Sequence, residues 1–165
     1  MKEIRYEAPG TLDEAVRLLA GADGDARILA GGTDLLVQMR AGVVAPGLIV
    51  DVKNIPEMMT IRESGGGFVV GAAVSGAEIG EHEALRRAWP GVVEAINLIG
   101  SKQVQGRASA GGNLCNASPA ADSVPAMVAA AAVVIIRARR DGASCRSRSC
   151  RPAPARPRSH AASWS

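Results

Sequence analysis

The sequence contains few of the residues on which metal centres, disulfide frameworks and side-chain nucleophiles depend. Its 165 residues include three cysteines and two histidines. Cys115 stands alone in the body of the chain, and Cys145 and Cys150 have no histidine or second cysteine pair at ligand spacing. We therefore expect no zinc or iron–sulfur site, no Ser/His/Asp triad, and neither a metal ligand nor a catalytic side chain.

Long apolar runs are also missing. No apolar stretch approaches about 18 residues, and no basic leader precedes an apolar segment. We expect no membrane span and no secretory signal, and hence a cytoplasmic protein. The content of hydrophobic residues (47%) and charged residues (21%) is typical of a globular protein, and the length allows one domain or two small subdomains with a buried core.

The net charge of +3 is unevenly distributed along the chain. Residues 1–137 hold 12 Lys and Arg against 15 Asp and Glu, a net charge of −3, whereas residues 138–165 hold seven Arg and one Asp, a net charge of +6. No patch of interleaved basic and aromatic residues occurs in the mildly acidic body, so we expect no nucleic-acid partner there. Nucleic-acid binding would depend on the basic end alone.

Residues 138–165 differ from the body in composition. They contain no Val, Ile, Leu, Met or Phe and are rich in Arg, Ser, Ala and Pro, which predicts a disordered tail. If GC-rich codons are assumed for residues 141–150, a shifted reading frame yields alternating charged and apolar residues typical of folded protein. We therefore predict a frameshift near residue 138 and a truncated chain, with a natural Arg-rich tail as the alternative.

The body alternates short helices and strands. Thr11–Glu14 and Ser75–Glu78 have the pattern of capping boxes that begin helices. The remaining predicted elements are strands at Arg27–Ala30 and Leu48–Val52, a helix from a Thr33 cap to about Arg40, a hairpin of Thr60–Glu63 with Phe68–Ala73, a helix ending at Gly100, a helix from Pro119 toward Met127, and a last strand at Val133–Ile136.

Two glycine-rich segments carry the chemistry. In Ile28–Leu35, a strand runs through Gly31 and Gly32 into a helix start, which would expose backbone N–H groups to an anion such as a phosphate. The segment has neither the Walker A pattern nor GxGxxG, and a purely structural turn is the alternative. In Ser109–Asn113, paired glycines again expose backbone donors in a predicted loop, and Asp122 follows, either as a polar site residue or as a residue that complements a helix N-terminus.

The segments ILAGGTDLLVQMRAG and IGSKQVQGRASAGGNLCNASPAADSVPAM resemble the FAD-binding subunits of the molybdopterin dehydrogenases, the medium chains of carbon monoxide dehydrogenase and xanthine dehydrogenase relatives. The resemblance runs from about Ile4 to Ile136. It implies an α+β FAD-binding domain of the vanillyl-alcohol oxidase (PCMH) type, with one subdomain at residues 1–55 and a second at residues 56–137. A C-terminal flavoprotein domain that the family carries is not matched after Ile136.

Carried over residue by residue, the resemblance implies a set of FAD-binding residues in the two segments, with an apolar residue near the flavin and an acidic one on the cofactor. They are Ile28, Leu29, Ala30, Gly31, Gly32, Thr33, Asp34, Leu35, Ile99, Ser109, Ala110, Gly111, Gly112, Asn113 and Asp122.

The resemblance further implies an electron-transfer subunit of a molybdenum hydroxylase. Electrons would pass from an iron–sulfur small subunit through FAD to NAD or another acceptor, while a molybdopterin large subunit oxidises the substrate. On its own the chain is then expected to be inactive on that substrate. The alternative is an inactive, truncated remnant that does not retain FAD.

Overall fold

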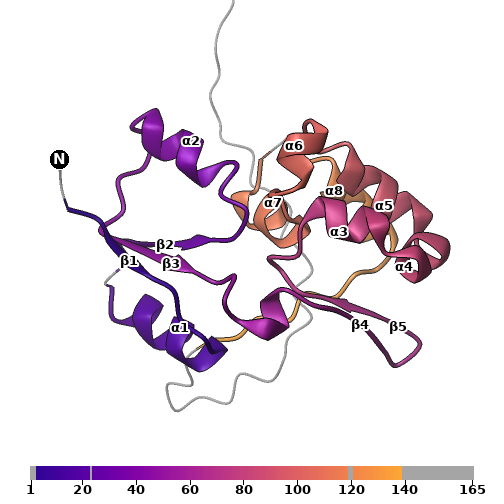
Figure 1. Cartoon of the computed structure of the whole chain (residues 1–165), viewed down its shortest axis with the longest axis horizontal. Coiled ribbons are helices and arrows are strands. Elements are labelled where there is room, and N and C mark those ends of the chain that lie inside the picture. Colours follow the sequence, from indigo (N-terminus) through magenta and orange to yellow (C-terminus); the bar gives the residue numbers. More distant parts are fainter. Residues whose placement is uncertain (1–2, 23, 119–120, 139–165) are drawn as a thin grey trace, which may run out of the picture.

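The N-terminal half is built around a buried strand, β3 (Leu48–Asp51), at the centre of a three-stranded parallel sheet. The computed structural model describes residues 3–22, 24–118 and 121–138. The strands β1 (Arg5–Glu7) and β2 (Ala26–Leu29) flank β3, and all three run in the same direction (Figure 1). A central parallel strand is covered on both faces, which accounts for its run of apolar residues.

Helix α1 (Leu12–Ala20) covers one face of this sheet. Thr11 begins it by accepting a hydrogen bond from the Glu14 N–H through its side chain, as predicted, although the Glu14 carboxylate accepts from the Gly10 N–H rather than from Thr11. Apolar residues of α1 and of the chain after β3 complete a first core with the sheet: Leu12, Ala15, Leu18, Leu19, Leu48, Val50, Val52, Ile55, Met58, Met59 and Ala73.

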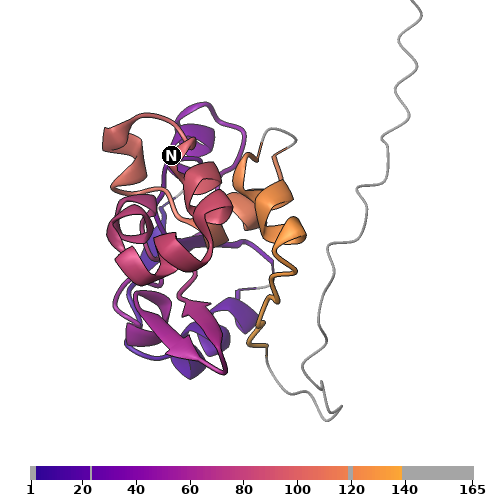
Figure 2. The same cartoon turned by 90° about the vertical axis from the view of Figure 1, so that its right-hand side faces the viewer.

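The second half consists of a hairpin and a group of short helices (Figures 1 and 2). The predicted hairpin is confirmed as β4 (Ile61–Ser64) and β5 (Gly67–Val70), antiparallel, with Gly65 and Gly66 at positive φ in the turn. The helices are α3 (Gly76–Glu81), α4 (Glu83–Ala88), α5 (Pro90–Asn97), α6 (Lys102–Gln105), α7 (Ala110–Asn116) and α8 (Ser123–Ala129), with a 3₁₀ turn at Pro56–Met58 between the halves.

A second core lies between the hairpin and these helices. It contains Val74, Ile79, Leu85, Val93 and Ile96, with Ile61, Phe68 and Val70 packed against it. The capping box predicted at Ser75–Glu78 is present in both directions and begins α3. The mixture of a parallel sheet, a hairpin and helices confirms the predicted α+β class. The division into subdomains at residues 1–55 and 56–137 stays a prediction, and the first core includes Met58, Met59 and Ala73 from beyond that boundary.

Several predicted elements differ in the structure. The helix after the first glycine segment, α2 (Leu35–Arg40), has Asp34 rather than Thr33 at its N-cap, and no side chain caps it. The second glycine segment is not a loop: Gly111 and Gly112 lie in the first turns of α7. Helix α5 ends at Asn97, and Gly100 (φ 61°) lies beyond it.

The C-terminal end of the described chain also departs from expectation. Val133–Ile136 forms no strand, and Val133, Ile135 and Ile136 are exposed. A strand needs hydrogen bonds from a neighbour, and no other described segment pairs with these residues. Pro119 and the tail beyond Ala138 lie outside the described residues. In the part of the chain that the structure describes, no helix is long and apolar enough to cross a membrane.

Candidate functional site

The first glycine segment lies at the carboxyl edge of the parallel sheet. Ile28 and Leu29 belong to β2, and Ala30–Asp34 then turn the chain into α2, which Leu35 begins. Gly32 adopts φ 80°, a conformation that favours glycine, and its carbonyl accepts from the Leu36 N–H at 3.1 Å. The N–H groups of Gly31 and Gly32 have no acceptor among the described residues. Ligands of parallel sheets bind at this edge, so the turn is placed to meet one.

The second glycine segment is positioned by a buried serine. Ser109 is 3% exposed and caps α7, because its hydroxyl accepts from the Gly112 N–H at 3.1 Å. The carbonyl of the preceding Ala108 accepts from the Gly76 N–H at 2.8 Å, which ties the start of α7 to the start of α3. Sequence reasoning identified the segment but not its helical form.

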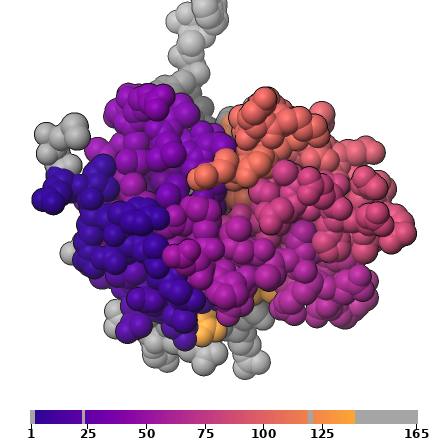
Figure 3. Space-filling view, viewed as in Figure 1, coloured from indigo at the N-terminus to yellow at the C-terminus, as the bar shows by residue number. Residues whose placement is uncertain are grey.

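The first glycine segment touches the residues that lead into the second. A Cβ atom placed on Gly31 would lie 2.6 Å from the carbonyl carbon of Arg107 and 3.1 Å from Cα of Ala108, so the two backbones touch where Gly31 has no side chain. Further along, the Gln38 side-chain amide of α2 donates to Oδ1 of Asn116 in α7 at 2.9 Å. The space-filling view shows the two halves in contact (Figure 3). Pairing of Gln38 with Asn116 was not foreseen from the sequence.

Gly111 shows the same kind of close approach. A Cβ atom there would lie 2.5 Å from the Ala72 carbonyl oxygen and 2.6 Å from the Ala72 Cβ atom. At Gly31 and Gly111, therefore, the missing side chain lets protein backbone approach protein backbone. Besides any role in binding an anion, these two glycines allow their segments to pack closely against neighbouring backbone.

Among the described residues, three other predicted site residues, Asn113, Asp122 and Ile99, form no hydrogen bond with the first glycine segment. Asp122 is exposed at the N-cap of α8 and makes no side-chain capping bond, whereas Asn113 donates to the hydroxyl of the buried Ser123 at 2.7 Å, which links α7 to α8. Ile99 lies half-buried in the turn after α5, where its N–H donates to the Ile96 carbonyl.

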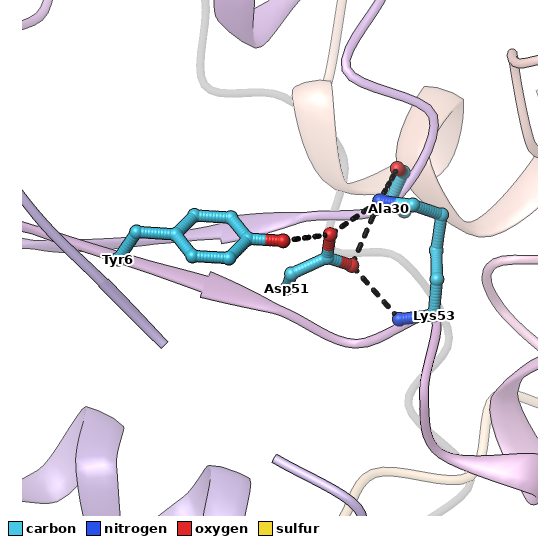
Figure 4. A network of polar contacts seen from close by, with 4 residues as sticks. All are labelled: Tyr6, Ala30, Asp51 and Lys53. Atoms are coloured by element: carbon cyan, nitrogen blue, oxygen red, sulfur yellow. Dashed lines mark hydrogen bonds and ion pairs between the residues drawn. The ribbon is translucent and has the colours of Figure 1, made fainter. Parts of the chain in front are cut away.

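A polar network that sequence reasoning missed lies beside the first glycine segment (Figure 4). Lys53 Nζ donates to both carboxylate oxygens of Asp51, at 2.7 and 2.8 Å, and to the Ala30 carbonyl at 3.1 Å. The Tyr6 hydroxyl donates to the same carboxylate at 2.6 Å. The available signal was a pair of charged residues, Asp51 and Lys53, at the end of a strand that is otherwise wholly apolar.

The charge of this network is fixed by its hydrogen bonds. Burial raises the pKa of Asp51, but the hydrogen bonds from the Lys53 side chain, from Tyr6 and from the Lys53 backbone N–H, together with the Lys53 charge, outweigh burial and hold that pKa below its ordinary value. The bond to Asp51 raises the pKa of Tyr6, helped by partial desolvation and by the nearby negative charge. At neutral pH, Asp51 is therefore a carboxylate facing an ammonium group.

Comparison with known proteins identifies the family. The pattern of the FAD-binding domain in molybdopterin dehydrogenase matches residues 2–146. The chain belongs to this family. Its cofactor is accordingly FAD, and the predicted resemblance is confirmed.

Several named members of this family are similar to this chain over most of its length. The carbon monoxide dehydrogenase medium chain of Hydrogenophaga pseudoflava is 34% identical over 119 residues, which is 72% of this chain and 42% of that protein. The nicotinate dehydrogenase FAD-subunit of Eubacterium barkeri is 33% identical over 137 residues, 82% of this chain and 46% of the relative. The xanthine dehydrogenase FAD-binding subunit of Escherichia coli O157:H7 is 34% identical, covering 72% and 40%.

Solved structures agree on the fold. The carbon monoxide dehydrogenase of H. pseudoflava superposes with a TM-score of 0.68 at 34% identity, covering 71% of this chain and 41% of that one. The reconstituted enzyme of Oligotropha carboxidovorans gives 0.71 at 31% identity, covering 73% and 42%. The chain thus spans less than half the length of these relatives.

Proposed function

We propose that this chain is the FAD-binding electron-transfer subunit, or part of it, of a molybdenum hydroxylase. In this proposal an iron–sulfur small subunit delivers electrons, a molybdopterin large subunit oxidises the substrate, and NAD or another acceptor receives the electrons. The observation that supports it most directly is the close approach of Gly31, at the carboxyl edge of the sheet, to Arg107 and Ala108, which lead directly into the second glycine segment, in a family whose cofactor is FAD.

The residues of the chain fit the diphosphate of such a cofactor. Gly31 and Gly32 have backbone N–H groups without an acceptor among the described residues, and such donors are the usual partners of phosphate oxygens. Residues 28–35 and 109–113 would hold the cofactor, with Asp122 as a polar contact and Ile99 on the apolar side. When bound, FAD supplies the redox chemistry.

The protein then has a limited task. The segments must bind the cofactor and fix its position, and no side chain has to act as acid or base. Among the described residues, no group of three or more His, Cys, Asp or Glu side chains is placed to hold a metal ion. In this proposal the partner subunits carry out substrate oxidation.

The first experiment is FAD titration of the purified chain, followed by flavin fluorescence, with NAD as a control dinucleotide that carries no flavin. Saturable FAD binding that excess NAD does not displace is expected. No FAD binding by a chain folded according to circular dichroism would instead support the alternative, a remnant without cofactor.

A second experiment tests the electron-transfer role. The FAD-loaded chain should reduce an artificial dye with NADH and should not hydroxylate purines or aldehydes or oxidise carbon monoxide by itself. Adding the iron–sulfur and molybdenum subunits of a related complex should couple the two activities. Substrate oxidation by the isolated chain would contradict the assignment.

A further inference from the structure

A lysine outside both glycine segments forms a hydrogen bond to the first of them. Lys53 follows β3 and reaches across to β2, where its ammonium group donates to the Ala30 carbonyl at 3.1 Å. The Lys53 side chain is 28% exposed and the Asp51 side chain 10% exposed. An ammonium group with three donors is here shared between one carboxylate and one backbone carbonyl (Figure 4).

The position of the ammonium group is fixed from two sides. Asp51 accepts from Lys53 Nζ, from the Lys53 backbone N–H at 3.0 Å and from the Tyr6 hydroxyl. The strand register places Leu29 opposite Asp51, and the next residue, Ala30, accepts from the same ammonium group as the Asp51 carboxylate. Lys53 therefore has little freedom to leave the Ala30 carbonyl without breaking its ion pair.

Binding the Ala30 carbonyl also determines the direction of the next N–H group. None of the described peptide bonds is cis, and in a planar trans peptide the N–H points opposite to the C=O. Since the Ala30 carbonyl faces Lys53, the N–H of Gly31 faces away from Lys53, and it is one of the donors without an acceptor among the described residues. A cation on the carbonyl also polarises the amide and makes its N–H a stronger donor.

We propose that Lys53 is a positioning residue for FAD: it holds the Ala30–Gly31 peptide so that the Gly31 N–H is directed at the cofactor diphosphate. Lys53 itself does not touch the cofactor in this proposal, and Asp51 and Tyr6 keep it in place. The proposal rests on the proposed FAD site and adds to it a residue that neither glycine segment contains.

The test compares FAD affinity with folding stability in the full chain. Lys53→Met should weaken FAD binding about tenfold, the effect expected when one hydrogen bond to a charged partner is lost. Lys53→Arg, which keeps a cationic donor, should recover part of that affinity. Arg62→Met removes an equal charge from the exposed face of β4 and should bind FAD as the wild type does.

A double variant separates positioning from stability. Lys53→Met leaves the Asp51 carboxylate without its cation and should lower the melting temperature. Asp51→Asn with Lys53→Met removes the unpaired charge, so it should melt close to Asp51→Asn alone, while its FAD affinity should stay about tenfold below that of the wild type. Recovery of FAD affinity together with stability would overturn the proposal, because it would make the role of Lys53 structural only.

Amide NMR spectra of the FAD-free chain give an independent readout. The Gly31 resonance should move in Lys53→Gln, which removes the ammonium group but keeps a polar side chain, and should stay in place in Arg62→Met. An unmoved Gly31 resonance would refute the positioning role. The role would also be refuted if the wild type binds FAD and the Lys53 variants bind it equally well. Failure of the wild type itself to bind FAD would refute the proposed function, and the Gly31 resonance would still decide whether Lys53 sets this peptide.

Discussion

Replacing Gly31 with alanine should push the first glycine segment away from Arg107 and Ala108, the residues that lead into the second segment. The new Cβ atom would lie 2.6 Å from the Arg107 carbonyl carbon and 3.1 Å from Cα of Ala108. The Arg107 carbonyl oxygen lies closer still, and carbon atoms pack at about 3.5–4.0 Å, so the backbones must move apart by at least about 1 Å. Overpacking costs about 1–3 kcal/mol, and we expect the upper half of that range because the obstacle is backbone, which cannot rotate away as a side chain can.

Urea unfolding followed by circular dichroism measures this cost, and FAD titration measures its effect on the site. Gly10→Ala is the matched control, because nothing lies within 4 Å of a Cβ atom at Gly10. Gly31→Ala should lose about 2–3 kcal/mol relative to that control and bind FAD at least about tenfold more weakly, since both segments must hold the same cofactor. If the two variants have equal stability and equal FAD affinity, the contact of Gly31 with Arg107 and Ala108 does not organise the site.

Three further outcomes are expected. Ser75→Ala should lower the free energy of unfolding in urea by about 1 kcal/mol, because it removes the hydroxyl that caps α3 in a reciprocal pair with Glu78. Ser75→Thr should keep most of that stability. An unchanged unfolding midpoint in Ser75→Ala would contradict the role of the capping box. The pKa of Asp51 is lowered in the folded state, so the stabilisation from its ion pair is fully present above the unfolded pKa of about 3.9 and is lost as pH falls through the folded value. The difference in unfolding free energy between wild type and Asp51→Asn should therefore shrink in acid. A difference that is constant with pH would argue against the ion pair. Gln38→Ala should weaken FAD binding while leaving the melting temperature nearly unchanged, because the half-buried Gln38–Asn116 bond joins α2 to α7 without contributing to either core. If Gln38→Ala and the control Gly10→Ala bind FAD equally well, that role is refuted.

The elements that could be predicted from the sequence are those set by local chemistry. The capping pattern at Ser75–Glu78 begins a helix because both hydrogen bonds are made within four residues. The run Leu48–Val50 forms a strand because it is apolar throughout and therefore suits a position covered on both faces. The glycines at the turn of the hairpin supply the positive φ values that the turn needs. In each case the requirement is contained in one short segment.

Tertiary contacts explain what the sequence could not indicate. Glycine pairs usually weaken a helix, so the second segment is predicted as a loop, yet Gly111 lies in α7, where its missing side chain allows the chain to lie against Ala72. The short strand β1 has little apolar character, and it forms because β3 offers a free edge. Val133–Ile136 shows the converse, since apolar residues without a neighbouring strand do not make one.

The first glycine segment contains both kinds of requirement in adjacent residues. Gly32 is glycine for a local reason, because the chain turns there through φ 80°. Gly31 is glycine for a distant reason, because the backbone of Arg107 occupies the space of its side chain. Both residues are glycine in the sequence, so the sequence can locate the turn but cannot show that the turn is also a contact surface.

The same limit applies to Lys53. In the sequence it is only a charged residue after a strand, and the fold brings the Ala30 carbonyl within reach of its ammonium group. Residues that fix the geometry of a binding segment from outside it can therefore be found only once the fold is known, and variants at these positions test whether that geometry matters to the cofactor.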